Sequence, residues 1–333
     1  MVRHFSGDTC DEVWRAAAVP LAAGMDAAHT GSRQGDTLEY LHCIFEVRDP
    51  RQRWVLSRTP ALNPAFAIAE VIWILLGSRS SKLINYWNRR LPQFAGRGEK
   101  YHGAYGYRLR ARFGFDQIDR ACDALSANRD SRQVVLQIWN AEDDLPNADG
   151  TPRDADIPCN LVSMLKIRDA HLYWTQVLRS NDLFLGVPHN FVQFTTLQEV
   201  VSGCLGVGLG PYVHISDSLH LYAKDSAAFG VSSPALRVPN TDNLAVPRHE
   251  LATILGAVGE LMLELSGDGL PSSAIMRVAT DRALPEAWRN LVCVLAADAA
   301  RRRRWFDEMA AAVAGCTNPV LQTAWAAWQK RVG

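Results

Sequence analysis

Two short polar segments near the middle of the chain combine residue types suited to covalent chemistry. In the first, Pro158-Cys159 opens a predicted strand directly after a polar loop, which places a thiol at the mouth of a potential cavity. A single cysteine is more often a small buried hydrophobic residue than a nucleophile. The second segment, Arg179-Ser180-Asn181-Asp182, follows about twenty residues later. An arginine close to a thiol favours the thiolate and can bind a phosphate, so this clustering makes Cys159 a candidate nucleophile.

Further polar residues lie in or beside apolar elements. Gly186-Val187-Pro188-His189-Asn190 separates two apolar segments, and its polar side chains cost free energy unless a ligand or a partner satisfies them. Asn190 can alternatively cap a helix start. Upstream, Glu70 lies within the apolar run 64–77, where a carboxylate is either paired in the core or held for proton transfer.

The elements that position these residues follow from periodicity and from turn signals. We expect a helix over 11–27 interrupted by Pro20, a strand over 37–47, a buried helix over 64–77, a β-rich run over 131–140, two strands over 159–180 joined at Arg168-Asp169, a helix over 189–204 and a strand over 212–222. Residues 78–115 are expected to be mostly irregular, and 141–158 to form a polar loop. The last ninety or so residues read as helical, with breaks near 267–271 and 317–319. The order predicts an N-terminal helical segment (1–29), an α+β catalytic domain (30–245) and a helical C-terminal extension packed on the same domain (246–333).

Composition limits the classes of function. The 333 residues include 35 Lys+Arg and 35 Asp+Glu, and a net charge of zero argues against a general nucleic-acid or membrane-surface binder. The run Arg301–Arg304 is interpreted as the solvated face of a helix. The glycines of GCLGVGLG (203–210) are interpreted as a turn, because they follow a helix rather than a strand.

The cysteines and the N-terminus indicate a compartment. Seven cysteines are scattered and never spaced as CxxC, so neither a zinc site nor a disulfide framework is expected. The N-terminal segment lacks the apolar core of a signal peptide, and no apolar run approaches the ~18 residues of a spanning helix. These features predict a cytoplasmic protein that needs no metal.

Several motifs, in order along the chain, resemble the signature of the thymidylate synthase superfamily, which includes the thymidylate synthases and the pyrimidine-nucleotide hydroxymethylases. The signature segments are PCN (158–160), LRSND (178–182), LGVPHN (185–190) and HISDSLHLY (214–222). Upstream, SRQGDT (32–37) is similar to the phosphate-arginine loop, AEVIWILLG (69–77) to the helix with the catalytic glutamate, GAYGYRLR (103–110) to the catalytic tyrosine segment, and SRQVVLQIWN (131–140) to the segment that reaches a partner subunit's phosphate site. The match covers roughly residues 30–240 and implies a mixed sheet flanked by helices, followed here by the helical extension.

The chemistry implied by the resemblance is electrophilic substitution at C5 of a pyrimidine, a carbon that is not nucleophilic by itself. Addition of a thiolate to C6 turns the ring into an enolate or enamine that can attack a one-carbon electrophile. The resemblance implies these catalytic residues: Cys159 as the nucleophile, Arg179 beside it, Glu70 and Tyr105 in proton transfer, and Asp182 at the pterin. The implied one-carbon donor is 5,10-methylenetetrahydrofolate, which would also lie against Glu70, Trp87 and Gly186.

The resemblance also implies a nucleotide site, formed by Arg33, Arg132, Gln133, Asn160, Arg179, Ser180, Asn181, Asn190, His220 and Tyr222. Arg132 would reach the phosphate from a second subunit, which implies a homodimer. His220 and Tyr222 lie two residues apart on a strand and match the pair that binds the sugar 3′-hydroxyl. The Asn190 amide carries a donor and an acceptor, so it can pair with N3–H and O4 of uracil, whereas the family's cytidylate hydroxymethylases have Asp there.

Four features depart from the synthases. Asn160 follows the nucleophile where the synthases have His, Gln133 stands where a second phosphate arginine is usual, and His189 replaces a usual aromatic residue. The chain ends in AWAAWQKRVG after the helical segment, whereas the synthases end in a short apolar tail that closes over the site during hydride transfer. A site open to water favours hydration of the transferred carbon over its reduction.

We therefore favour a pyrimidine-nucleotide 5-hydroxymethylase with a uracil base, leaving cytosine and either sugar open. The first alternative is a divergent thymidylate synthase that methylates dUMP and releases dihydrofolate. An alternative of another class is a catalytically inactive homologue that binds nucleotide or RNA. The joint presence of Cys159, Glu70, Tyr105 and Asp182 argues against inactivity.

Overall fold

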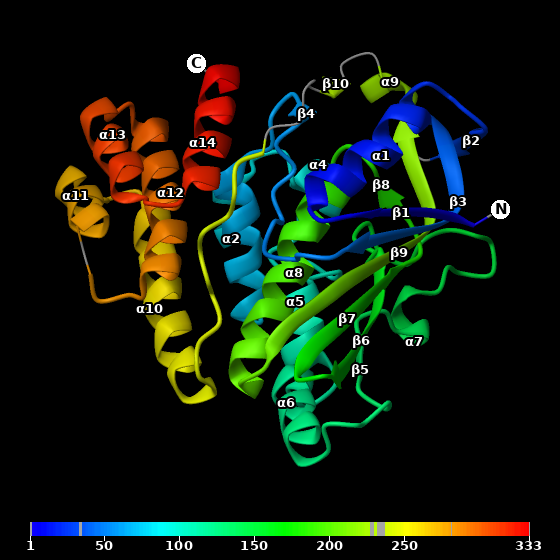
Figure 1. The fold of residues 1–333 in the computed structure, drawn as a ribbon. Helices are drawn as coiled ribbons and strands as arrows, with labels where there is room; N and C mark the ends of the chain where they lie inside the picture. Colours follow the sequence, from blue (N-terminus) through cyan, green and yellow to red (C-terminus); the bar gives the residue numbers. More distant parts are fainter. Residues whose placement is uncertain (1, 33–34, 227–229, 232–236, 281, 333) are drawn as a thin grey trace.

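The computed structural model describes residues 2–32, 35–226, 230–231, 237–280 and 282–332, and it contains an eight-stranded sheet (Figure 1). The sheet consists of β1 (Arg3–Gly7), β2 (Ala28–Ser32), β3 (Gly35–Val47), β5 (Val135–Gln137), β6 (Asn160–Arg168), β7 (His171–Leu178), β8 (Asn181–Asp182) and β9 (Gly208–Tyr222). Its order is β1-β3-β9-β7-β6-β5, with β2 beside β3 and β8 beside β9. β4 (Arg58–Thr59) pairs separately with β10 (Gly230–Val231). Parallel and antiparallel pairs both occur, which confirms the predicted mixed sheet.

The hairpin formed by β6 and β7 brings distant parts of the sequence together. The two strands are antiparallel and are joined at Asp169 and Ala170, which both have positive φ. This agrees with the predicted turn to within one residue. Because both ends of a hairpin lie at the same edge, the residue before β6 and the residue after β7 become neighbours.

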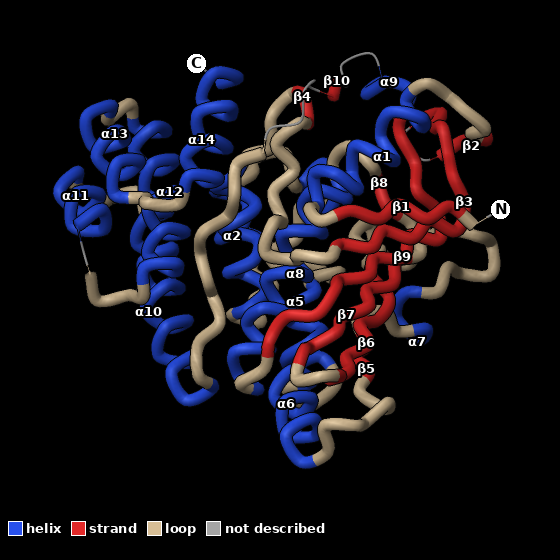
Figure 2. The backbone as a smooth tube through the Cα atoms, viewed as in Figure 1, coloured by secondary structure: helices blue, strands red, loops and turns tan. Residues whose placement is uncertain are grey.

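The two faces of the sheet differ. Figure 2 shows most helices gathered on one side of the strands, where α8 (Gly186–Leu205) packs on β7 and β9. Strand register aligns two rows of side chains on the opposite face, all apolar except Thr175: Val162, Val177 and Ile215, and Val135, Met164, Thr175 and Val213. These side chains are half-buried, apart from Val135, which is exposed. Within the described residues this face is an apolar surface with incomplete cover.

Helix α2 (Pro64–Leu75) lies between α8 and the C-terminal helices. Asn63 sets its start by accepting a hydrogen bond from the N–H of Phe66 at 3.2 Å, and Pro64 occupies the first helical position. Gly77 follows the helix with φ +65°, as expected of a stop residue. Its side chains are apolar on all sides except at Glu70, so the helix is buried almost throughout.

The remaining helices lie before and beyond this core. Their bounds are α1 (Cys10–Ala22), α3 (Ser81–Trp87), α4 (Pro92–Ala95), α5 (Tyr105–Tyr107), the π-helical turn η1 (Arg108–Arg112), α6 (Gln117–Ala127), α7 (Ala141–Asp144), α9 (Ala223–Ser226), α10 (Arg248–Ser266), α11 (Ser272–Thr280), α12 (Glu286–Arg303), α13 (Phe306–Gly315) and α14 (Pro319–Val332). A buried polar cluster connects α12 and the start of α14 to the segment before α10: Asp242 accepts hydrogen bonds from Asn290 at 2.7 Å and from Asn318 at 2.6 Å.

Among the described residues, no helix has the length and apolar character needed to cross a bilayer.

Of the arginine run 301–304, which was predicted to be a solvated helix face, only Arg304 is exposed. Arg301 and Arg302 bind the fully buried carboxylate of Asp298 at 2.9 and 2.6 Å. Arg302 also donates to the backbone carbonyl of Trp87 at 2.9 Å, and Arg303 to the hydroxyl of Tyr86 at 2.8 Å. A buried carboxylate requires paired cations, so the run attaches α12 to α3 instead of facing water.

Other local predictions need smaller corrections. The first helix ends at Ala22 rather than continuing to residue 27, and only Val135–Gln137 of the run 131–140 is a strand. The segment 78–115, predicted to be irregular, contains α3, α4, α5 and η1. These helices are short, and α3 is stabilised by the burial of Ile84 and Trp87 rather than by a clear sequence period.

Candidate active site

Cys159 and Arg179 meet at the open end of the β6–β7 hairpin. The backbone N–H of Arg179 donates to the carbonyl of Cys159 at 3.0 Å. The Arg179 guanidinium donates to the carbonyls of Pro158 at 3.0 Å and Ile157 at 3.2 Å, and its Nη2 lies 3.8 Å from Cys159 Sγ. These contacts hold a positive charge beside the sulfur, where it stabilises the thiolate.

Tyr105 lies at the start of α5, near Cys159 and Asn160. Burial raises the pKa of Tyr105, and the neighbouring Cys159 raises it further. The hydroxyl therefore stays protonated. Gly106 permits this placement, because a Cβ at that position would come within 2.3 Å of the carbonyl oxygen of Ile74 in α2.

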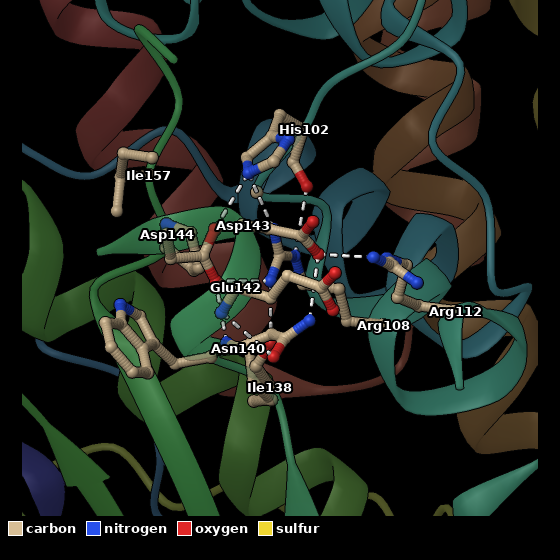
Figure 3. A network of polar contacts seen from close by, with 12 residues as sticks. His102, Arg108, Arg112, Ile138, Asn140, Glu142, Asp143, Asp144 and Ile157 are labelled. Atoms are coloured by element: carbon tan, nitrogen blue, oxygen red, sulfur yellow. Dashed lines mark hydrogen bonds and ion pairs between the residues drawn. The ribbon is translucent and has the colours of Figure 1, made fainter. Parts of the chain in front are cut away.

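A buried polar network supports this tyrosine segment (Figure 3). Arg108 donates to both carboxylate oxygens of Asp144 at 2.6 and 2.9 Å, and His102 lies 2.8 Å from the same carboxylate. Burial opposes the charge on Asp144, but hydrogen bonds led by Arg108 outweigh it and lower the pKa of that carboxyl. Nearby, the N–H of Gly103 donates to Asp156 at 2.7 Å. The network ties the tyrosine segment to the loop that leads to the candidate nucleophile.

Glu70 on α2 faces His189 on α8 across the contact between these two helices. Oε2 of Glu70 lies 3.4 Å from Nδ1 of His189, on the first turn of α8. Both atoms are buried and neither has a hydrogen-bond partner within the described part of the chain. The His189 ring packs edge-on against Phe66, with ring centroids 5.0 Å apart. A small movement would bring the carboxylate and the imidazole within normal hydrogen-bond distance.

A second polar group gathers at the end of β9. Ser180 Oγ lies 3.5 Å from Nδ1 of His220, whose ring packs edge-on against Tyr222. Asp182 pairs with His220 in the β8–β9 register, and its Oδ1 accepts two backbone N–H groups at 2.7 and 3.0 Å. Burial raises the pKa of Asp182 and lowers the pKa of His220. Ser180 and Asp182 follow Arg179 directly, so this group adjoins the cysteine.

Asn190 and Asn181 are buried together beside these residues. Asn190 Nδ2 donates to Asn181 Oδ1 at 3.0 Å. The Asn181 amide donates in turn to His214 and Ser216, so it has no free N–H for a nucleotide. Gly186 lies against both amides.

Three predicted site residues that the structure describes stand apart from this cluster, and a fourth, Arg33, lies outside the described residues. Arg132 and Gln133 are exposed just before β5. Trp87 is fully buried on α3, and its indole N–H has no hydrogen-bond partner among the described residues. The roles of these four residues stay predictions.

A sequence profile described as thymidylate synthase matches residues 26–240, which is well over half of the chain. The chain belongs to the thymidylate synthase family. A deoxyuridylate hydroxymethyltransferase of Bacillus phage SP01 is 32% identical over 228 residues, covering 63% of this chain and 58% of that protein. A protein of the same name from Pseudomonas phage M6 is 35% identical over 175 residues, covering 52% and 48%. A putative thymidylate synthase of Methanocaldococcus jannaschii is 28% identical over 188 residues, covering 56% and 76%.

The chain spans about half the length of the phage relatives. Membership in the family confirms the resemblance. The residues present fit a pterin in one respect: the hydrogen bonds of Asp182 to the backbone use Oδ1, which leaves Oδ2 to accept N–H groups. The described residues contain no group of three or more His, Cys, Asp or Glu side chains placed to hold a metal.

Sequence reasoning did not find three of the residues that build the site. Arg108 and Asp144 lie 36 positions apart and give no local signal of a buried ion pair. His214 lies within the quoted motif 214–222, but alternation alone could not show that it contacts Asn181. His189 was noticed as a departure from the synthases, and its contact with Glu70 depends on how α8 packs against α2.

Proposed function

We propose that this chain transfers a one-carbon unit from 5,10-methylenetetrahydrofolate to C5 of a pyrimidine nucleoside monophosphate, as a 5-hydroxymethylase with a uracil base favoured. The observation that carries the proposal is the 3.8 Å contact between Arg179 Nη2 and Cys159 Sγ. Two relatives named deoxyuridylate hydroxymethyltransferase support the reaction type and the base.

In the proposed mechanism, Cys159 Sγ adds to C6 of the pyrimidine and C5 becomes nucleophilic. Arg179 keeps the sulfur ionised, and its Nη1, which has no hydrogen-bond partner among the described residues, is available to a phosphate oxygen. The folate supplies the one-carbon unit. Because its raised pKa keeps the hydroxyl neutral, Tyr105 relays the proton that leaves C5: its oxygen takes up that proton while its own proton passes to a water molecule.

Hydration of the transferred carbon requires a water to lose a proton. Glu70 and His189 lie together on the wall formed by α2 and α8, and their facing atoms have no other hydrogen-bond partner within the described residues. We propose that His189 accepts the water proton while the Glu70 carboxylate stabilises the resulting imidazolium. An aromatic side chain without a basic nitrogen, such as Phe, could not accept this proton. The histidine therefore favours hydroxymethylation over methylation.

We also propose a homodimer formed through the open face of the sheet. The rows of Val, Ile and Met described above would be covered by a second copy, as expected for an apolar surface of this kind. Arg132 is exposed beside β5 at the edge of that face and makes no described contact with the cysteine site of its own chain. It is therefore free to reach the phosphate site of a partner subunit.

The second candidate is a thymidylate synthase that methylates dUMP, supported by the archaeal relative named as a putative thymidylate synthase. Incubating the protein with methylenetetrahydrofolate and 5-tritiated dUMP separates the two. Tritium release without the absorbance rise of dihydrofolate supports hydroxymethylation, whereas both signals together support methylation. Release of no tritium from any of dUMP, UMP, dCMP and CMP would refute C5 transfer altogether.

A further inference from the structure

We propose that Asn181 and His214 form a positioning pair that locks the amide of Asn190 in one orientation and thereby makes the site select uracil over cytosine. The inference rests on the proposed function in one respect, namely that Asn190 faces the pyrimidine base. It assigns no direct ligand contact to Asn181 or His214.

The pair consists of a continuous chain of buried hydrogen bonds. Asn190 Nδ2 donates to Asn181 Oδ1 at 3.0 Å, and Asn181 Nδ2 donates to His214 Nε2 at 2.8 Å. Ser216 Oγ gives Asn181 Nδ2 a second contact at 3.2 Å. Asn190 is 7% exposed, Asn181 3% and His214 0%, so water does not compete for these bonds.

The position of the proton on His214 determines which group donates and which accepts in these hydrogen bonds. Burial lowers the pKa of His214 to about 3, so the ring is neutral and carries one N–H. Because Nε2 accepts from Asn181, the proton lies on Nδ1, which is 3.0 Å from the hydroxyl oxygen of Tyr212. The rings of Phe45 and Phe191 pack edge-on against the imidazole and hold its plane.

Turning either amide alone breaks the series of hydrogen bonds. If Asn181 rotated alone, its NH2 would face the NH2 of Asn190, and its oxygen would face the unprotonated nitrogen of His214. One contact would place a donor against a donor and the other an acceptor against an acceptor. In a buried site such unsatisfied polar groups are costly in free energy. A consistent reversal requires Asn181 and Asn190 to turn together while the His214 proton moves to Nε2.

Space around Asn181 is restricted as well. A Cβ at residue 186 would come within 2.6 Å of Asn181 Oδ1, so glycine at this position leaves room for the oxygen to accept from Asn190. The amide of Asn181 is thus confined on the side of Gly186 and bonded on the side of His214.

The consequence for the ligand follows from hydrogen-bond patterns. With one N–H committed to Asn181, Asn190 presents its carbonyl oxygen and its second N–H to the cavity. Uracil offers O4 as acceptor and N3–H as donor, whereas cytosine offers the reverse pattern at the same two positions. An amide that cannot turn pairs with one base and meets two mismatched contacts with the other.

The test measures dissociation constants of the full-length protein for dUMP and dCMP by calorimetry, without folate. The wild type should bind dUMP more tightly than dCMP. Asn181→Leu should lower the ratio Kd(dCMP)/Kd(dUMP) by about tenfold or more, because Asn190 can then turn. Asn181→Asp should keep the ratio, since a carboxylate still accepts from Asn190. Ser216→Ala, the control, should change it less than about twofold, because it leaves the bond to His214 intact.

An unchanged ratio in a folded Asn181→Leu variant would overturn the inference. If that variant does not fold, His214→Phe provides the same test, and a wild-type ratio in it also overturns the inference. The ¹⁵N chemical shifts of His214 in the wild type supply an independent measurement: a proton on Nδ1 is expected, and a proton on Nε2 contradicts the assigned direction. A wild type that binds neither nucleotide overturns the proposed function, and the inference with it.

Discussion

Replacing His189 by phenylalanine tests the proposed route of water to the transferred carbon. The substitution keeps an aromatic ring against Phe66, whose centroid lies 5.0 Å away, and removes the nitrogen 3.4 Å from Glu70 Oε2. General bases contribute about 10²- to 10⁴-fold to proton-transfer steps. A separation of 3.4 Å exceeds a normal hydrogen bond, so Glu70 orients the imidazole loosely, and we expect the lower end, a loss of ~10²-fold in hydroxymethylation.

The assay follows both products from dUMP and methylenetetrahydrofolate. Chromatography measures 5-hydroxymethyl-dUMP, and absorbance measures dihydrofolate formed by any methylation that replaces hydration. His249→Phe is the matched control, since that side chain is 82% exposed on α10 and the substitution should leave the hydroxymethylation rate unchanged. A His189→Phe enzyme that forms hydroxymethyl product at the wild-type rate would refute the role assigned to this residue.

Three further outcomes follow from the structure. Asp144→Asn leaves the buried guanidinium of Arg108 without its partner and should lower the free energy of unfolding by about 3–5 kcal/mol in urea titrations; a loss below about 1 kcal/mol would contradict the assigned network. Burial raises the pKa of Asp156 from 3.8 to about 6, so the folded state binds more protons than the unfolded state between these values. The stability of the wild type relative to Asp156→Asn should therefore fall as pH rises from about 4 to 6, by ~3 kcal/mol at most, and parallel curves would exclude the shift. Finally, mixing inactive Arg132→Ala and Cys159→Ala proteins should restore part of the activity through hybrid dimers that contain one intact site, whereas no recovery would argue against a shared phosphate site.

The sequence predicts best those parts of the site that depend on local connectivity. Cys159 and Arg179 could be paired in advance because they flank a hairpin, and strand alternation with one turn is sufficient to place them together. The helix that carries Glu70 was equally clear, since Pro64 and Gly77 mark its ends.

Contacts between elements far apart in the chain were beyond such reasoning. Whether the arginines at the end of α12 face water depends on Asp298, whose burial is a property of the packed helices. Likewise Asn181 was predicted to bind the nucleotide, and only the strand order, which places β8 beside β9, shows that its amide is committed to His214. A residue type fixes what a side chain can do, and its neighbours decide which of these roles it has.

The position of α2 has a consequence for the timing of proton exchange. This helix packs against α8 on one side and against α10 and α12 on the other. Packed helices rather than solvent therefore lie behind the residue that carries the Glu70 carboxylate. The side of Glu70 that faces His189 is therefore the side open to proton exchange. Under the proposed function, two bound substrates would cover that side, and the water and protons that complete a turnover would have to be in place before the substrates bind.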